Sequence, residues 1–431
     1  MHLRRKAALL TAAALLSVGA ASSAHATGGA ASTTTGLEGI PHFSHVVVLF
    51  EENENAESTF AAGSPFTYLT KTLESKGVFV PNYYGTGHVS LDNYITFASG
   101  QPGNPLTYSD CLAVSLWTCA QTTSALSSGR NLADQLEAAG VSWKQYSDGA
   151  PSPCFHAPYV SGDTSPDPYQ GASQTPPAKD YADRHNPWIY FTDVIGNQAR
   201  CDAHVRPYTE LANDLAAGTV PSFAFITPDT CHDGHDAKCS NGSPGGLVGA
   251  QAWLSQQGPA LVDWLAKNDG LLVVTFDENG VSGTSGQPGC AAALCPSLGA
   301  GGRIGAVFVS PRLKQGATVT SAYDHHALLR TVEDSFGISE HLNLAAAARS
   351  MADVFAGAAP AAGATTTPGS SKTQTAPPKR SPSTPTAVAP SRGLAATGAT
   401  PGLAIVALLL VAAALFVCGR LWQGARHVGD R

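Results

Sequence analysis

The sequence "HVVVLFEENEN", from His45 to Asn55, passes directly from an apolar run into a cluster of carboxylate and amide side chains. Val46–Phe50 is apolar on both faces, which is typical of a strand buried in the middle of a parallel sheet. The acidic residues that follow repel one another unless a cation lies among them. The stretch therefore predicts a buried strand that delivers oxygen ligands to one edge of a sheet.

Three further apolar runs have the composition of buried strands. They are "SFAFIT" (Ser222–Thr227), "LLVVTF" (Leu271–Phe276) and "IGAVFVS" (Ile304–Ser310). The helical patterns "TELANDLAAG" and "GPALVDWLAKNDG" precede the first two of these runs, and each pattern ends at a glycine. Buried strands that alternate with helices predict an α/β domain with a mainly parallel central sheet.

Polar side chains follow three of these predicted strands at the point where each strand ends. In a parallel sheet, ligands bind beyond the carboxyl ends of the strands. Hard cations prefer carboxylate and amide oxygens. We therefore expect a divalent metal ion at this edge, although an acidic, solvated loop is the alternative for "EENEN" by itself. The expected ligands are Glu52 and Asn53 from one strand end and Asp277 and Glu278 from another.

The two ends of the chain have the composition of targeting segments, not of a packed fold. Residues 1–26 have a basic start, an apolar middle and a small-x-small end, which predicts a signal peptide. A globular domain is expected over residues 39–357, and the Pro-, Thr-, Ser- and Ala-rich residues 358–393 predict an extended tether. Residues 402–419 are uninterrupted and apolar, which predicts a transmembrane segment, and the basic tail 420–431 predicts a cytoplasmic C-terminus.

The cysteines fit an exported domain. Eight of the nine lie between the two targeting segments, and an even count in an oxidising compartment predicts disulfides. A zinc site made only of cysteines is the alternative. From their spacing, the expected pairs are Cys111–Cys119, Cys231–Cys239 and Cys290–Cys295, which leaves Cys154 and Cys201 for each other. The formal net charge of −7 is spread without long runs and gives no reason to expect a nucleic-acid partner.

The segment "GTGHVSLDNYITFASG" (Gly85–Gly100) carries a family resemblance. "SLDNYITFASG" resembles the nucleophile segment of the alkaline-phosphatase superfamily. Within that superfamily, "VVVLFEEN" and "HVSLDNY" are similar to motifs of the bacterial phosphoesterase family that contains phospholipases C and certain acid phosphatases. Five further motifs match in order, so the resemblance covers roughly residues 40–340. They are "RHNPWIYFTDV", "FITPDTCHDGHD", "VVTFDENG", "GGRIGAVFVSPRLKQG" and "YDHHALLRTVEDSFG".

This resemblance implies a three-layer α/β/α fold, an esterase activity on phosphoric esters and a role for each matching residue. It makes Ser90 the nucleophile, which also completes the shell of the metal held by Glu52, Asn53, Asp277 and Glu278. It makes Asn93 a donor to a phosphoryl oxygen. It implies that three histidines bind phosphate or protonate the leaving oxygen: His88, His235 and His325. Two-metal relatives hold a second ion with one Asp and two His, for which Asp229, His235 and His325 are the candidates. The sequence leaves open whether there are one or two ions.

Some residues depart from the family pattern. Val89 and Asp92 stand where proline is common, and Asp92 is expected to place a negative charge near the phosphate. Glu54 stands where His or Arg is frequent, which makes the site more acidic. We expect residues 185–188 to form a turn with a packed tryptophan and no catalytic role.

The C-terminal sequence "LAATG", residues 394–398, lies between the tether and the apolar segment and resembles a cell-wall sorting signal. That resemblance implies cleavage by a sortase and attachment to peptidoglycan, whereas a simple membrane anchor is the alternative. We expect a monomeric, cell-surface phosphoric ester hydrolase that acts either on soluble phosphomonoesters or on phospholipid headgroups. A binding protein or adhesin that keeps the fold without turnover is the competing hypothesis.

Overall fold

The computed structural model describes residues 36–105, 107, 110–111, 116–125, 127–156, 180–235, 239–280 and 301–358. The predicted signal peptide, tether, LAATG motif, transmembrane segment, basic tail and Cys290–Cys295 pair lie outside the described residues. Within the described part of the chain, no helix is both long and apolar enough to cross a membrane.

In the described part of the chain, eight strands form the central sheet in the order β5-β4-β6-β1-β7-β8-β2-β9. All neighbouring pairs run parallel except β7–β8 and β8–β2. This sheet confirms the predicted, mainly parallel α/β architecture. The strands are β1 (His45–Glu51), β2 (Gly77–Val80), β4 (Trp143–Ser147), β5 (Val205–Pro207), β6 (Phe223–Thr227), β7 (Gly270–Phe276), β8 (Ala306–Val309) and β9 (Ala317–Thr318). A second, two-stranded sheet pairs β3 (Tyr83–Tyr84) with β10 (Tyr323–Asp324).

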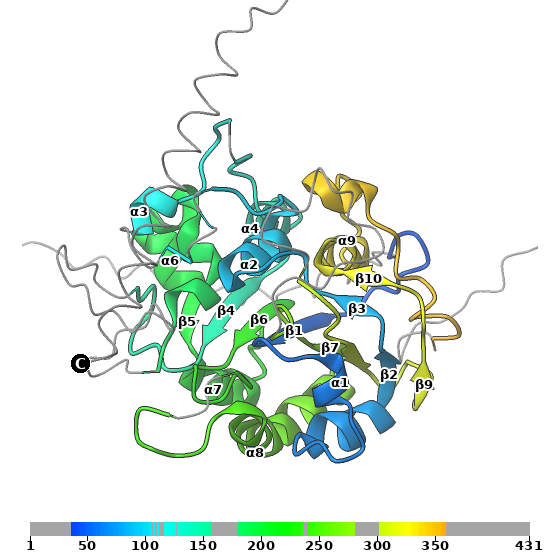
Figure 1. The fold of residues 1–431 in the computed structure, drawn as a ribbon. Helices are drawn as coiled ribbons and strands as arrows, with labels where there is room; N and C mark the ends of the chain where they lie inside the picture. The colour runs from blue at the N-terminus through cyan, green and yellow to red at the C-terminus, as the bar shows by residue number, and fades with distance from the viewer. Residues whose placement is uncertain are drawn as a thin grey trace, which may run out of the picture. The chain divides into compact units, whose positions relative to one another are not determined.

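Helices cover both faces of the central sheet (Figure 1). On one face lie α2 (Ser90–Ser99), α4 (Leu132–Ala138) and α9 (His325–Ser335), and on the other lie α7 (Leu211–Ala217) and α8 (Gly246–Lys267). The arrangement is the predicted three-layer α/β/α sandwich. Shorter helices are α1 (Ala56–Thr59), α3 (Leu116–Cys119), α5 (Thr192–Ile195), α6 (Gln198–His204), η1 (Tyr68–Leu73), η2 (Asp183–His185), η3 (Pro187–Tyr190), η4 (Tyr208–Glu210) and η5 (Asn343–Ala347).

The core is centred on β1, which lies between β6 and β7. Its Val46–Phe50 segment is fully buried, as expected for a strand covered on both faces. Phe50 packs against Phe97 of α2 and Phe225 of β6, with ring centroids 5.2 and 5.1 Å apart. The register places Glu51 of β1 opposite Phe276 of β7, so the residues that follow these two strands emerge together at one edge.

Three of the predicted disulfides are present and confirmed. They join Cys111 to Cys119, Cys154 to Cys201 and Cys231 to Cys239. In the first and third of these pairs the two cysteines are 8 residues apart, whereas Cys154 and Cys201 are 47 residues apart.

Candidate active site

The ends of β1 and β7 are joined by hydrogen bonds between the predicted metal ligands. The backbone N–H of Asn53 donates to Asp277 Oδ1 at 2.9 Å, and Asn53 Nδ2 donates to Glu278 Oε1 at 3.3 Å. Asn53 has a φ of 36°, in the left-handed region that Asn tolerates better than most residues. The chain therefore turns sharply after β1 and places the Asn53 amide against the β7 carboxylates.

Ser90 lies at the first position of α2 and contacts another of the predicted ligands, Glu52. Its Oγ donates to Glu52 Oε2 at 2.9 Å, and the hydroxyl of Tyr94, one turn further along, donates to Glu52 Oε1 at 2.6 Å. Ser90 and Tyr94 thus share a helix face and hold both oxygens of one carboxylate. Because a helix N-terminus favours negative charge, Ser90 stands where an anionic phosphate is electrostatically favoured.

The chemistry of this cluster fits a hard divalent cation. Asn53 Oδ1 and Asp277 Oδ2 are buried and accept no hydrogen bond from the described part of the chain. Burial, with the added charges of Glu52 and Glu278, raises the pKa of Asp277 well above its usual range. Burial also raises the pKa of Glu278 to about 7. A cation held by Glu52, Asn53, Asp277 and Glu278 would satisfy these oxygens and allow the carboxylates to ionise together.

The pKa of Glu52 shifts in the opposite direction because Arg184, His185 and the Tyr94 hydroxyl surround this carboxylate. Burial acts to raise its pKa, but His185, Arg184 and the Tyr94 hydroxyl outweigh burial and lower the pKa to about 2. His185 Nε2 lies 3.3 Å from Glu52 Oε1, and its ring stacks on Tyr94 with centroids 5.2 Å apart. The expected turn is present and Trp188 is fully buried. However, the sequence interpretation missed that His185 and Tyr94 contact the predicted site.

His88 and Asn93 lie on the loop and helix next to Ser90. His88 Nδ1 contacts Glu278 Oε2, so this histidine reaches the predicted metal ligands. Asn93 Oδ1 accepts from the backbone of Thr86 and Gly87, while its Nδ2 donates to the Gly87 and Val89 carbonyls. Asn93 therefore shapes the loop that carries His88. Its donation to a phosphoryl oxygen stays a prediction.

His325 is fully buried at the start of α9, where Asp324 caps the helix. Its Nε2 lies 2.6 Å from the carbonyl oxygen of Asp277, and its Nδ1 lies 3.1 Å from the hydroxyl of Tyr83. Because the carbonyl can only accept, Nε2 carries the proton and Nδ1 accepts from Tyr83. Burial lowers the pKa of His325 to about 4, so the ring is neutral and holds the backbone at Asp277.

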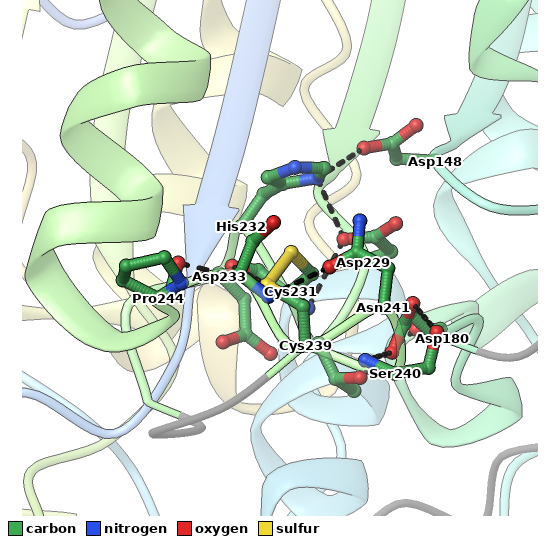
Figure 2. Close-up of a disulfide and its surroundings, with 12 residues drawn as sticks. Asp148, Asp180, Asp229, Cys231, His232, Asp233, Cys239, Ser240, Asn241 and Pro244 are labelled. Atoms are coloured by element: carbon green, nitrogen blue, oxygen red, sulfur yellow. Dashed lines mark hydrogen bonds and ion pairs between the residues drawn. A yellow bond between two sulfur atoms is a disulfide. The ribbon is translucent and has the colours of Figure 1, made fainter.

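The loop after β6 carries the predicted residues Asp229 and His235, and Figure 2 shows Asp229 beside His232. His232 Nδ1 lies 2.7 Å from Asp229 Oδ1 and 3.0 Å from Asp148 Oδ2. The ligand atoms of Asp229, His232 and Cys231 lie within 4.8 Å of one another, but the disulfide to Cys239 removes the Cys231 thiolate.

His235 is exposed on the same loop, and its backbone N–H donates to Asp233 Oδ1. Asp229 pairs with His232, whereas His325 contacts Asp277 and Tyr83. The three candidate ligands of a second ion thus have separate partners in this structure. A second ion at these residues stays a prediction.

Two acidic departures from the family pattern are less charged than the sequence suggested. Asp92 is buried, and its Oδ1 accepts from Thr107 Oγ1. Burial raises its pKa to about 8, so this carboxyl is neutral at pH 7 and does not add the expected negative charge. Burial likewise raises the pKa of Glu54 to about 7.

The fold and this edge define an α/β domain in which a serine hydroxyl contacts a carboxylate at the end of one strand, next to carboxylates at the end of the neighbouring strand. The chain belongs to the Phosphoesterase family, whose model matches residues 64–339. It is 27% identical over 300 residues to a probable acid phosphatase of Kluyveromyces lactis, covering 69% of this chain and 59% of that protein. It is 25% identical over 268 residues to an acid phosphatase of Aspergillus fumigatus, covering 62% of this chain and 50% of that protein.

A phosphatidylinositol-3-phosphatase of Mycobacterium tuberculosis is 23% identical over 299 residues, covering 69% of this chain and 79% of the relative. The chain thus spans between half and three fifths of the two fungal relatives' length and more of the mycobacterial one. Among solved structures, a phosphonate monoester hydrolase from Silicibacter pomeroyi is 14% identical with a TM-score of 0.42, covering 74% of this chain and 77% of that one.

Proposed function

We propose that this protein is an exported, metal-dependent hydrolase of phosphoric esters that uses Ser90 as its nucleophile. The observation that carries the proposal is the position of Ser90 Oγ, 2.9 Å from Glu52 Oε2 at the N-terminus of α2. Membership of the Phosphoesterase family supports the reaction class, and the names of the fungal and mycobacterial relatives support phosphate esters as substrates.

The residues of the chain divide the reaction between them. Ser90 Oγ attacks phosphorus and gives its proton to water, while the P–O bond to the alcohol breaks and the alcohol oxygen takes a proton from water. Water then attacks the phosphoseryl group and releases phosphate from Ser90. Glu52 orients Oγ, and the first turn of α2 stabilises the charge on the phosphoryl oxygens. A bound divalent ion would lower the pKa of the serine hydroxyl and neutralise part of the phosphate charge.

Where the protein acts is part of the same proposal. The basic and apolar composition of residues 1–26 supports export, and the LAATG motif supports attachment to peptidoglycan by a sortase. Deletion of residues 394–431 should release the protein into the medium. Continued attachment to the cell wall would contradict the anchor.

The direct test of the activity compares serine variants of the metal-supplemented full chain, with p-nitrophenyl phosphate and phosphatidylcholine as alternative substrates. Ser90→Ala should lower kcat by about 10³-fold or more, and a chelator should abolish turnover. Ser99→Ala is the matched control, because Ser99 is a buried serine at the far end of α2 whose Oγ bonds the Ile95 carbonyl. Undiminished turnover in Ser90→Ala would remove Ser90 as the nucleophile, and no turnover by the wild type would favour a binding protein.

A further inference from the structure

The beginning of α2 has an acceptor that comes from a distant loop. The N-cap residue Val89 offers no side-chain cap, so the first N–H groups of the helix need other partners. Asp110 Oδ1 accepts from the N–H of Leu91 at 2.9 Å. Leu91 directly follows Ser90, and Asp110 therefore acts on the helix one residue from the nucleophile.

A second side chain of the same loop holds this turn. Thr107 Oγ1 donates to Asp92 Oδ1, and Asp92 is the third residue of α2. Thr107 is linked to Asp110 by the hydrogen bond from the Asp110 N–H to the Thr107 carbonyl, at 3.0 Å. Asp110 and Thr107 thus contact the two residues that follow Ser90.

The Cys111–Cys119 disulfide fixes the loop at Asp110. Asp110 and Cys111 have φ angles of 53° and 59°, a left-handed conformation that residues other than glycine seldom adopt. The bridge ties this turn to Cys119, whose carbonyl accepts from Gln121 Nε2. The Gln121 N–H in turn donates to the carbonyl of Tyr190 in η3. The Asp110 turn is therefore anchored to the body of the domain through covalent and hydrogen bonds.

We propose that Asp110 is a positioning residue for Ser90, and that the Cys111–Cys119 disulfide holds Asp110 in place for this role. The inference rests on the proposed function of Ser90. Asp110 fixes the first turn of α2, and this turn keeps Ser90 Oγ directed at Glu52. The important property of Asp110 is a correctly placed acceptor oxygen, which an asparagine also provides.

The first test asks whether the acceptor oxygen of Asp110 or its negative charge is needed for activity. Asp110→Ala should lower kcat for p-nitrophenyl phosphate by about 10- to 100-fold with KM within about 2-fold of wild type, because orientation and not substrate contact is lost. Asp110→Asn should keep kcat within about 3-fold. The matched control is Asn131→Ala, which removes the cap of α4, where Asn131 Oδ1 accepts from the Asp134 N–H. This control should lower Tm without lowering kcat.

The second test asks whether the disulfide and Asp110 act as a unit. The Cys111→Ser/Cys119→Ser variant should show a kcat loss like that of Asp110→Ala, and adding Asp110→Ala to it should lower kcat by less than about a further 2-fold. The control is Cys154→Ser/Cys201→Ser, which removes a buried bridge elsewhere and should lower Tm at unchanged kcat. The positioning role would be overturned if the kcat losses of the disulfide variant and of Asp110→Ala multiplied in the combined variant. It would also be overturned if Asp110→Asn lowered kcat as much as Asp110→Ala.

A readout independent of turnover separates this proposal from the proposed function. Hydrogen–deuterium exchange of peptides that cover residues 89–94 should be faster in Asp110→Ala than in wild type or Asp110→Asn. Unchanged exchange in Asp110→Ala would overturn the proposal that Asp110 fixes the first turn of α2, even if the enzyme is active. If Asp110→Ala exchanges faster but the wild-type protein hydrolyses no phosphate ester, Asp110 still holds the first turn of α2, whereas the proposal that Ser90 is a nucleophile is refuted.

Discussion

Glu51 and Glu52 are neighbours in sequence and both are fully buried, yet their surroundings are opposite. Glu52 accepts hydrogen bonds from Ser90 and Tyr94 and lies next to His185, and its pKa is lowered to about 2. Among the residues that the structure describes, neither carboxylate oxygen of Glu51 has a hydrogen-bond partner. Burial and the charge of Asp233 raise the pKa of Glu51 well above its usual range.

The difference follows from the end of β1, where successive side chains point to opposite faces: Phe50 packs on α2, and Glu51, the last residue of the strand, points to the other face. Glu52, the next residue, contacts Ser90 and Tyr94 of α2 and His185 of η2, and Arg184 lies close enough to lower its pKa. An acidic residue at the end of a strand is therefore not by itself a functional residue. The contacts on its own face decide whether the carboxylate is ionised and directed at the nucleophile.

The largest expected effect is the difference in activity between two isosteric substitutions. Glu52→Gln should lower kcat/KM by about 10³-fold, because it removes a charged group that contacts Ser90 and is proposed to bind the metal. Glu51→Gln should stay within about 3-fold of wild type. Steady-state kinetics on p-nitrophenyl phosphate measure both, and equal losses in the two variants would break the comparison.

Metal binding should depend on the proposed ligands, which include Glu52 and Asp277, and should not depend on Glu51. Asp277→Asn should lower the affinity for the divalent ion by at least about 100-fold, because it removes one carboxylate from the proposed set of ligands. Elemental analysis after dialysis measures the bound metal, with Glu51→Gln as the control that should keep it. Wild-type stoichiometry in Asp277→Asn would contradict this ligand assignment.

Glu333, a buried glutamate that is not among the predicted ligands, shows the effect of burial on the pKa of a carboxyl group. Glu333 of α9 is fully buried, and burial raises its pKa to about 8 while its Oε1 accepts from the Leu342 N–H. The folded state therefore holds a proton that the unfolded state loses, and this contribution to stability decreases as pH rises from the unfolded pKa through about 8.

Glu333→Gln keeps the acceptor and removes the titration. Relative to the variant, wild type should lose roughly 2 kcal/mol of unfolding free energy between pH 6 and pH 9. Denaturant titrations at both pH values measure it. If the unfolding free energies of wild type and Glu333→Gln changed equally with pH, burial would not raise the pKa of Glu333.

The smallest expected effect concerns the stability contribution of Glu51. Glu51→Gln should raise the unfolding free energy at pH 7 by about 1 kcal/mol, because a neutral amide costs less to bury than a carboxyl group without partners. Denaturant unfolding of the metal-free protein measures the change. A loss of stability in this variant would show that Glu51 has a favourable partner.

The sequence predicted the frame of the fold because the frame depends on local patterns. The run Val46–Phe50 and the matching runs before Asp229 and Asp277 are apolar on both faces, and the structure places them on three adjacent parallel strands. The pattern "GPALVDWLAKNDG" covered only the second half of α8, which begins at Gly246 and includes Pro259. Glycine and proline obscured that helix, although tertiary packing overrides their low propensity.

The site could be predicted only as far as strand ends and motifs define it. The convergence of Asn53 with Asp277 and Glu278 follows from the carboxyl edge of a parallel sheet. The contacts of His185 and Asp110 do not follow, because they depend on loops whose paths no periodicity describes. Tyr94 was the one missed residue with a local signal, since it lies four positions after Ser90 and shares its helix face.

The phosphoseryl group itself is the most direct test of the central claim. Metal-loaded wild-type protein, mixed with p-nitrophenyl phosphate and quenched in acid within one turnover, should yield a peptide containing residues 85–100 that is phosphorylated at Ser90 by mass spectrometry. The Ser90→Ala protein should yield none. Turnover by the wild type without this adduct under conditions that trap other phosphoenzymes, or an adduct at another residue, would contradict Ser90 as the nucleophile.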